Sequence, residues 1–190
     1  LFAFDWDDVL HNTAEMRDFE STLFGLAGVP PEATAAAAFR VRMSGSFSLP
    51  RLIGEIGSYY PAVLAAAPTL QRVYHDTWEQ RGSLVFPDAE KFIQKLYGRF
   101  PLAIITIGDA EFQQRKVYRS GLGSLFNHMM FLAPQKNVAI AGQEKARAIG
   151  QLLELYPSVI YFDDRQEIIS AVHDEHSKHG RVIPFRVERR

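Results

Sequence analysis

Aspartate residues gather at two places in this sequence. Asp5 and Asp7 lie two positions apart near the start, and the adjacent pair Asp163 and Asp164 lies near the end. Neighbouring carboxylates can ligate a metal ion, attack as nucleophiles, or transfer protons as general acids and bases. Whether these four can act together depends on whether the fold brings the two groups to one place.

Both aspartate groups directly follow a short apolar run that is typical of a buried strand. Four such runs are expected to be strands, with Pro184 favouring an edge position for the last of them: residues 1–4, 102–106, 158–162 and 181–185. Three helices are expected between them, over residues 88–97, 110–120 and 143–156. The second helix has Asp109 as its N-cap and Gly121 as its stop. This alternation predicts an α/β fold with a Rossmann-like, three-layer core around a parallel sheet.

The stretch from Ala14 to Arg81 interrupts this alternation. It is long, rich in alanine and helical in pattern, and it lacks a convincing buried strand. Its Gly, Pro and Ser positions divide it into three or four helices. We therefore predict a small all-helical domain over residues 14–81, and an α/β core built from residues 1–13 and 82–190.

In a parallel α/β sheet, ligands bind at the carboxyl ends of the strands. The residues that follow the predicted strands there are Asp5, Asp7, Thr106, Asp163 and Asp164. Several like charges in one pocket require a cation, because each carboxylate raises the cost of ionising its neighbours. A site made only of oxygen ligands suits Mg²⁺.

The order and spacing of these residues resemble the motifs of the haloacid dehalogenase superfamily of aspartate-nucleophile phosphotransferases. Residues 2–10, Phe-Ala-Phe-Asp-Trp-Asp-Asp-Val-Leu, look like its first motif. Residues 104–106, Ile-Ile-Thr, resemble the second, and residues 161–167, Tyr-Phe-Asp-Asp-Arg-Gln-Glu, resemble the fourth. The predicted helical insert falls between motifs one and two, where members of this family carry a cap domain. The resemblance spans nearly the whole chain.

The resemblance implies a role for each matching residue. Asp5 would attack phosphorus and form an aspartyl-phosphate, which divides one difficult displacement into two easier steps. Asp7 would protonate the leaving oxygen and later deprotonate the attacking water. The Thr106 hydroxyl would donate to a phosphoryl oxygen, and the backbone N–H groups of Ile107 and Gly108 would bind the anion ahead of the next helix.

The resemblance also implies a metal site. Mg²⁺ would be held by Asp5, by the backbone carbonyl of Asp7 and by Asp163, with Asp164 or Glu167 assisting. Phe162 stands where this family often has glycine, so which of Asp163 and Asp164 touches the metal directly stays open.

The third motif of the family supplies a lysine, for which the sequence offers Lys145 and Lys136. We favour Lys145, because a lysine in the first turn of the expected 143–156 helix would oppose the helix dipole and so invites a functional reason. In the predicted cap, Arg42 is a candidate for binding a second anionic group of the substrate.

These expectations together predict a magnesium-dependent phosphatase, a phosphoric monoester hydrolase, acting on a small phosphorylated metabolite. A sugar-phosphate mutase of the same family and a non-catalytic protein that keeps the fold remain alternatives. A halide-displacing enzyme of this family has no need for an acid at position 7, so Asp7 favours phosphoryl transfer. A phosphonate-cleaving member needs a lysine in the cap, but the first lysine of this chain, Lys91, lies outside the predicted cap.

The composition of the chain argues against nucleic-acid and membrane partners and favours one cellular compartment. With 21 basic and 22 acidic residues, the chain has no overall attraction to nucleic acid or to an anionic membrane. There is no cysteine, and the longest strongly apolar run, Pro101–Ile107, is too short to cross a bilayer. We expect a cytoplasmic protein, monomeric or homodimeric, without nucleic-acid or membrane partners.

Overall fold

A computed structural model describes residues 1–43, 47–80, 84–135 and 137–189 of the chain. These residues divide into two compact units, one formed by Leu1–Asn12 with Val85–Arg190 and the other by Thr13–Leu84. The upper boundary predicted for the helical insert falls within residues 81–83, which lie outside the described part. Each unit is considered by itself below.

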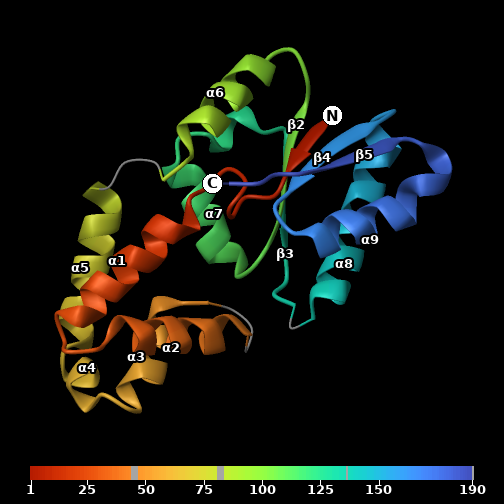
Figure 1. Cartoon of the computed structure of the whole chain (residues 1–190). Helices are drawn as coiled ribbons and strands as arrows, with labels where there is room; N and C mark the ends of the chain where they lie inside the picture. The colour runs from red at the N-terminus through yellow and green to blue at the C-terminus, as the bar shows by residue number, and fades with distance from the viewer. Residues whose placement is uncertain (44–46, 81–83, 136, 190) are drawn as a thin grey trace. The chain divides into compact units, whose positions relative to one another are not determined.

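The larger unit is built on a five-stranded parallel sheet with the strand order β3-β2-β1-β4-β5. The strands are β1 (Phe2–Phe4), β2 (Leu102–Ile107), β3 (His128–Leu132), β4 (Val159–Asp163) and β5 (Val182–Arg186). Helices α6 (Pro87–Leu96) and α7 (Ala110–Arg119) cover one face, and α8 (Val138–Leu155) and α9 (Gln166–His176) cover the other (Figure 1). Two short 3₁₀ helices, Gly123–Leu125 and Ser177–His179, complete this unit. The predicted fold class, a Rossmann-like α/β core with a small helical domain, is confirmed.

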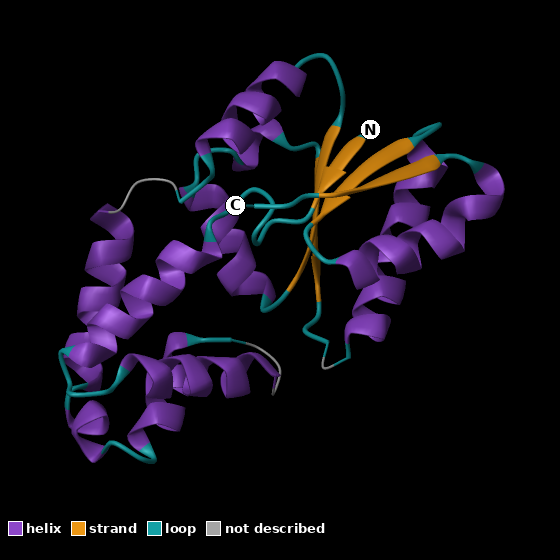
Figure 2. Ribbon diagram, in the orientation of Figure 1, coloured by secondary structure: helices purple, strands orange, loops and turns teal. Residues whose placement is uncertain are grey.

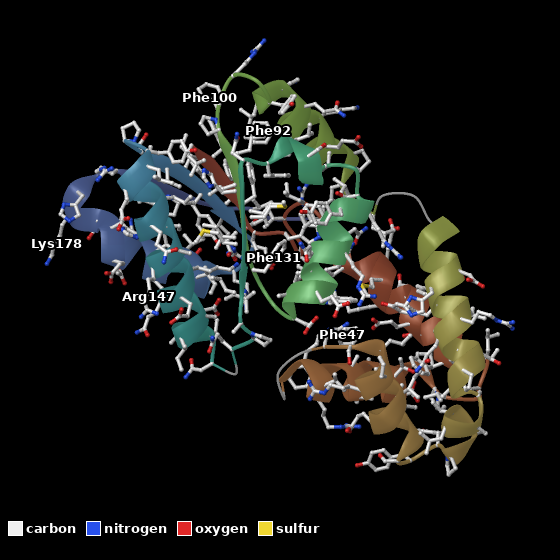
Figure 3. All side chains as sticks on the ribbon, turned by 180° about the vertical axis from the view of Figure 1, so that it is seen from behind. Phe47, Phe92, Phe100, Phe131, Arg147 and Lys178 are labelled. Atoms are coloured by element: carbon white, nitrogen blue, oxygen red, sulfur yellow. The ribbon has the colours of Figure 1, made fainter. Side chains whose placement is uncertain are left out.

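Alternation along the strands sends side chains into two separate apolar layers. On the α8 and α9 face, the small residues Ala3 and Ala103 and the larger Ile105 pack with Ile149 and Ile168. Aromatic residues fill the opposite layer: the Phe2 ring lies 6.4 Å from that of Phe92 and 5.1 Å from that of Phe100 (Figure 3). Because helices cover both faces of the sheet, side chains on both sides of a central strand pack against apolar residues, and the sequences of these strands are continuous apolar runs.

Two features of the sheet differ from expectation. Strand β3, with the sequence His-Met-Met-Phe-Leu, was not predicted, because it contains no β-branched residue and gives little strand signal. Helix α8 begins at Val138, five residues before the predicted start at residue 143, because Asn137 caps it by accepting from the Ala139 N–H at 2.8 Å. The predicted Asp109 cap of α7 is confirmed, with its side chain accepting from the Phe112 N–H at 2.9 Å.

In the part of the smaller unit that the structure describes, the regular elements are all helices, joined by loops and turns (Figure 2). Its elements are α1 (Thr13–Gly25), α2 (Pro31–Met43), α3 (Leu49–Gly57), the short α4 (Pro61–Ala65) and α5 (Ala67–Gln80). The buried residues Phe19 and Tyr74 join α1 to α5, with ring centroids 5.6 Å apart. Over the described ranges of both units, no helix is long and apolar enough to cross a membrane.

Two glycines of α8 differ in how much room they leave for a side chain. A Cβ on Gly142 would lie 2.6 Å from the Cβ of Ala171 in α9, whereas the nearest atom to a Cβ on Gly150 is His176 Cε1 at 3.8 Å. Gly142 therefore allows α8 and α9 to approach closely, and Gly150 has no such role.

We expect Gly142→Ala to lower the free energy of unfolding by about 1–3 kcal/mol, because it overpacks the α8–α9 contact. Gly150→Ala is the matched control, and should raise stability by up to about 1 kcal/mol through the helix propensity of alanine. Urea denaturation of both variants measures the difference. A Gly142→Ala variant as stable as wild type would show that the two helices adjust without cost.

Candidate functional site

Three carboxylates meet where strands β1 and β4 end. Asp5 directly follows β1, Asp163 is the last residue of β4, and Asp164 comes next. The two strands are hydrogen-bonded neighbours, and the Asp5 N–H extends their pairing by donating to Phe162 O at 2.8 Å. Each of the three aspartates offers a carboxylate oxygen, and these oxygens all lie within 4.8 Å of one another.

Lys145 is fully buried beneath this group and bridges two of its members. Its Nζ lies 2.8 Å from Asp5 Oδ2 and 2.6 Å from Asp163 Oδ2. The dipole argument that favoured Lys145 does not apply, because α8 starts at Val138 and places the lysine two turns into the helix. The other candidate for this role, Lys136, lies outside the described residues.

Two further donors fix the Asp163 carboxylate. The Tyr161 hydroxyl donates to Asp163 Oδ2 at 2.6 Å, and the Arg165 N–H donates to Oδ1 at 3.0 Å. The sequence analysis missed Tyr161, although strand periodicity could have found it, because residues two apart on a strand share a face. With Lys145 these contacts give both oxygens of Asp163 a partner.

The three carboxylates differ in how readily they ionise. Burial raises the pKa of Asp5 even though Lys145 opposes the shift. Burial also disfavours ionisation of Asp163, but the Lys145 ammonium and the hydrogen bonds from Tyr161 and Arg165 together outweigh it and lower the pKa. The pKa of Asp164 is raised to about 7 by burial and by the charges of Asp5 and Asp163.

One ammonium therefore faces three carboxylates, which leaves an excess of negative charge in a partly buried place. A divalent cation would offset that excess, and an all-oxygen donor set is the kind that Mg²⁺ prefers. The residues present thus fit a magnesium ion, with Asp5, Asp163 and Asp164 as the side chains that would hold it. The predicted contribution of the Asp7 backbone carbonyl stays a prediction.

Asp7 directs its carboxylate away from this group and toward α7. The tight loop after Asp5, in which the Leu10 and His11 N–H groups both donate to Trp6 O, separates the two aspartates. Gln113 Nε2 donates to Asp7 Oδ2 at 2.9 Å, and Lys116 Nζ donates to Oδ1. Burial alone would raise the pKa of Asp7, but Lys116, His11 and Gln113 together outweigh it and lower the pKa to about 2.

Of the other site residues predicted in the α/β unit, two lie at the hollow beside Asp5 and one does not. Thr106 and Ile107 line a hollow of about 220 Å³ together with Asp5, Asp7, Asp8, Asp164 and Arg165. The Gly108 N–H, predicted to bind an anion, instead donates to Leu132 O at 2.9 Å and so continues the pairing of β2 with β3.

Arg42 belongs to the helical unit. Its Nη2 lies 3.2 Å from Glu20 Oε2, and its guanidinium lies 4.8 Å from the centre of the Phe47 ring.

Sequence reasoning missed Gln113 and Lys116 because α7 was treated as a connection between strands. Their spacing of three residues, which puts both on one helix face, was the available signal. Nothing in the sequence alone shows that this face meets Asp7, because the contact joins residues more than a hundred positions apart.

The raised pKa of Asp164 predicts how the stability of the metal-free protein depends on pH. Between its ordinary value of 3.8 and the folded value of about 7, the folded chain binds more protons at Asp164 than the unfolded chain does. The contribution of Asp164 to stability should therefore fall as pH rises through this window, and Asp5, whose pKa is also raised, contributes with the same sign. His11, whose pKa burial lowers from 6.5 to about 4, contributes with the opposite sign between those two values.

We expect Asp164→Asn to reduce this fall in Tm between about pH 5 and pH 8, because the amide carries no charge at either pH. Asp174→Asn, at an exposed position of α9, is the control and should keep the wild-type profile. Thermal denaturation in the presence of a chelator measures both. Identical profiles for wild type and Asp164→Asn would contradict the assignment.

Comparison with known proteins gives a consistent fold. The sequence matches no family model and no curated protein. Among solved structures it is similar to one assigned as a haloacid dehalogenase-like hydrolase, from Burkholderia xenovorans, with a TM-score of 0.64 and 20% identity over 96% of this chain and 79% of that one.

Two further similarities show the range of activities in proteins of this architecture. One is to a predicted phosphoglycolate phosphatase from Haemophilus somnus, with a TM-score of 0.58 and 16% identity over 92% of this chain and 81% of that one. The other is to an L-2-haloacid dehalogenase, with a TM-score of 0.59 and 18% identity over 99% and 86% of the two chains. At these identities the likeness concerns the fold, and the chain adopts the fold of the haloacid dehalogenase superfamily.

Proposed function

We propose that this chain is a magnesium-dependent phosphatase that hydrolyses a small phosphorylated metabolite through an aspartyl-phosphate on Asp5. One observation carries the proposal. Asp5 lies beside Lys145 and two further carboxylates at the carboxyl edge of the sheet, and a second acid, Asp7, lines the same hollow and is held by donors from α7.

Asp5 is the proposed nucleophile. Its Oδ2 is held by Lys145 at 2.8 Å and its Oδ1 accepts from the Trp6 N–H at 2.8 Å, so the carboxylate is fixed in orientation. Asp7, whose pKa is about 2 in the free protein, must first take up a proton as the anionic ester binds beside it. In the first step a carboxylate oxygen of Asp5 then attacks phosphorus, the bond to the leaving oxygen breaks, and that oxygen takes the proton from Asp7. In the second step Asp7 removes a proton from water, whose oxygen attacks phosphorus and frees inorganic phosphate and Asp5.

Asp7 separates this proposal from halide displacement, which the fold also supports in other proteins. A halide leaves as a stable anion and needs no proton, whereas an alkoxide leaving group does. Donors from α7 engage both oxygens of Asp7, which indicates that this side chain has a defined position. A phosphate ester is therefore the better substrate class for this site.

Thr106 and the metal site complete the proposed machinery. The buried Thr106 lines the same hollow as Asp5, where its hydroxyl is suited to donate to a phosphoryl oxygen. Ile107 lines the hollow too, and its backbone N–H is proposed to donate a second hydrogen bond to the phosphoryl group, as the resemblance implies. Bound Mg²⁺ would offset the negative charge of the phosphoryl group and of the carboxylates.

The helical unit, Thr13–Leu84, is proposed to act as the lid that selects the substrate. A lid of this kind excludes water and bulky polymers, which favours small metabolites. Arg42 is proposed to bind a second anionic group, in exchange for its pairing with Glu20.

The central test is phosphate release from a panel of small phosphoesters with and without Mg²⁺. We expect Asp5→Asn to abolish release and Asp7→Asn to lower kcat by about 100- to 10,000-fold, which is the usual contribution of a positioned acid–base group. Asp174→Asn is the matched control and should keep wild-type activity. An Asp5→Asn variant that hydrolyses the same esters at the wild-type rate would exclude Asp5 as the nucleophile.

The same panel separates a phosphatase from a sugar-phosphate mutase. Incubation with a sugar 1-phosphate should yield free sugar and inorganic phosphate. An isomerised sugar phosphate without free phosphate would replace hydrolysis by intramolecular transfer as the reaction.

Metal binding can be tested without any substrate. Titration calorimetry should show that Mg²⁺ binds the wild-type chain and binds Asp164→Asn at least about tenfold more weakly, because one anionic ligand is lost. Binding should also raise the Tm of the wild type, since the ion binds the folded state. Equal affinity in the two proteins would remove Asp164 from the metal site.

A further inference from the structure

Helix α7 presents two buried polar side chains to Asp7. Gln113 and Lys116 are each only 4% exposed, and their spacing of three residues puts them on the same helix face. Gln113 Nε2 lies 2.9 Å from Asp7 Oδ2, and Lys116 Nζ contacts Oδ1. Each oxygen of the Asp7 carboxylate thus has its own donor from α7.

Burying these two groups is costly unless each has a partner. An ammonium removed from water must be paired and hydrogen-bonded, and Asp7 supplies the opposite charge for Lys116. Gln113 gives its amide N–H groups to Asp7 and, at 3.3 Å, to Ile107 O. Neither residue belongs to the motifs that assigned the nucleophile, the metal ligands or Lys145.

Gly108 makes room for the contact with Gln113. A Cβ at Gly108 would lie 2.7 Å from Gln113 Nε2, closer than real Cβ atoms come to other atoms, and 3.0 Å from its Cγ, which is a tight contact. The glycine therefore leaves the space through which the Gln113 side chain passes from α7 toward Asp7. This gives residue 108 a role different from the anion binding expected of its backbone N–H.

We propose that Gln113 and Lys116, with the space left by Gly108, position the Asp7 carboxylate for proton transfer. Two attachment points fix both the location of the carboxylate and its rotation, whereas one would leave the group free to turn. The Asp7 side chain is 30% exposed and so is not held by packing alone. Because proton transfer requires a donor held to within a fraction of an ångström, loss of either attachment lowers the rate. This inference rests on the proposed phosphatase activity.

Esters with different leaving groups distinguish positioning of Asp7 from a merely structural role. Phenyl phosphate has a basic leaving oxygen that needs a proton, whereas 2,4-dinitrophenyl phosphate releases a stable anion that does not. The ratio kcat/KM reports the steps up to release of the phenol, in which Asp7 is the proton donor. Loss of the acid function therefore lowers kcat/KM much more for phenyl phosphate.

The variants are Lys116→Met and Gln113→Leu, each compared with Asp7→Asn. We expect Asp7→Asn to lower kcat/KM on phenyl phosphate by about 100-fold or more. Lys116→Met and Gln113→Leu should each lose about tenfold more on phenyl phosphate than on the dinitrophenyl ester. Lys116→Arg should restore part of the activity, since it keeps a charged donor. Arg115→Met, which removes an exposed α7 cation paired with Glu111, is the matched control and should change neither ester.

Two further variants complete the test: a double variant, and a substitution at Gly108 that disturbs the contact between Gln113 and Asp7. In the Asp7→Asn background, Lys116→Met should cause no further loss on phenyl phosphate, because the residue acts through Asp7. Gly108→Ala should reproduce the Gln113→Leu pattern by displacing the amide. Circular dichroism confirms folding, and Gln113→Leu, which leaves the ion pair intact, carries the test if Lys116→Met does not fold.

The outcomes separate this inference from the function on which it rests. A wild type that cleaves neither ester overturns the proposed function and this inference with it. A wild type that cleaves both, with equal losses for the two esters in Lys116→Met and Gln113→Leu, overturns the positioning role alone. A further loss from Lys116→Met in the Asp7→Asn background does the same.

Discussion

The buried ammonium of Lys145 is the interaction on which the rest of the site depends. The parallel sheet places the ends of β1 and β4 side by side, which forces Asp5 and Asp163 together. Without a positive charge between them, two buried carboxylates could not both ionise. Lys145 reaches them from α8 without solvent exposure, so the position of that helix on the sheet is part of the site's electrostatics. The close approach of α8 to α9 at Gly142 belongs to the same requirement.

Asp5 and Asp7 have the same side chain but different pKa values, because their surroundings in the fold differ. They are two residues apart, yet the pKa of Asp5 is raised by burial, whereas Lys116, His11 and Gln113 together lower the pKa of Asp7 to about 2. The Asp5 side chain lies at the strand ends beside Lys145, and the Asp7 side chain contacts α7. In the free protein these shifts run against the proposed roles, because a nucleophile must be ionised and a general acid must carry a proton. A cation bound beside Asp5 and an anionic ester beside Asp7 would shift both pKa values in the direction that the roles require.

The sequence indicated the sheet and the acidic site because both depend on local patterns. Continuous apolar runs that end in acid identify central parallel strands, and strand order then brings Asp5 next to Asp163. Strand β3 was missed because an edge strand without β-branched residues has a weak local signal. Lys145 was chosen from an expected helix start that proved to be five residues late, so the residue reaches the acids for a different reason from the one given.

The roles of Gly108, Gln113 and Lys116 could not be predicted, because they arise from a contact between segments far apart in the chain. In the sequence, Gly108 precedes a capped helix and is indistinguishable from a glycine that exposes its backbone to an anion. In the structure its N–H is engaged by Leu132, and its missing side chain admits Gln113. The fold is shared by phosphatases and dehalogenases, and so does not decide the reaction. That decision depends on whether the chain keeps an acid at position 7 and holds it in place. An enzyme that expels a halide has no use for a buried lysine and glutamine directed at that position. Their cost of burial is therefore evidence about the leaving group as well as about the loop.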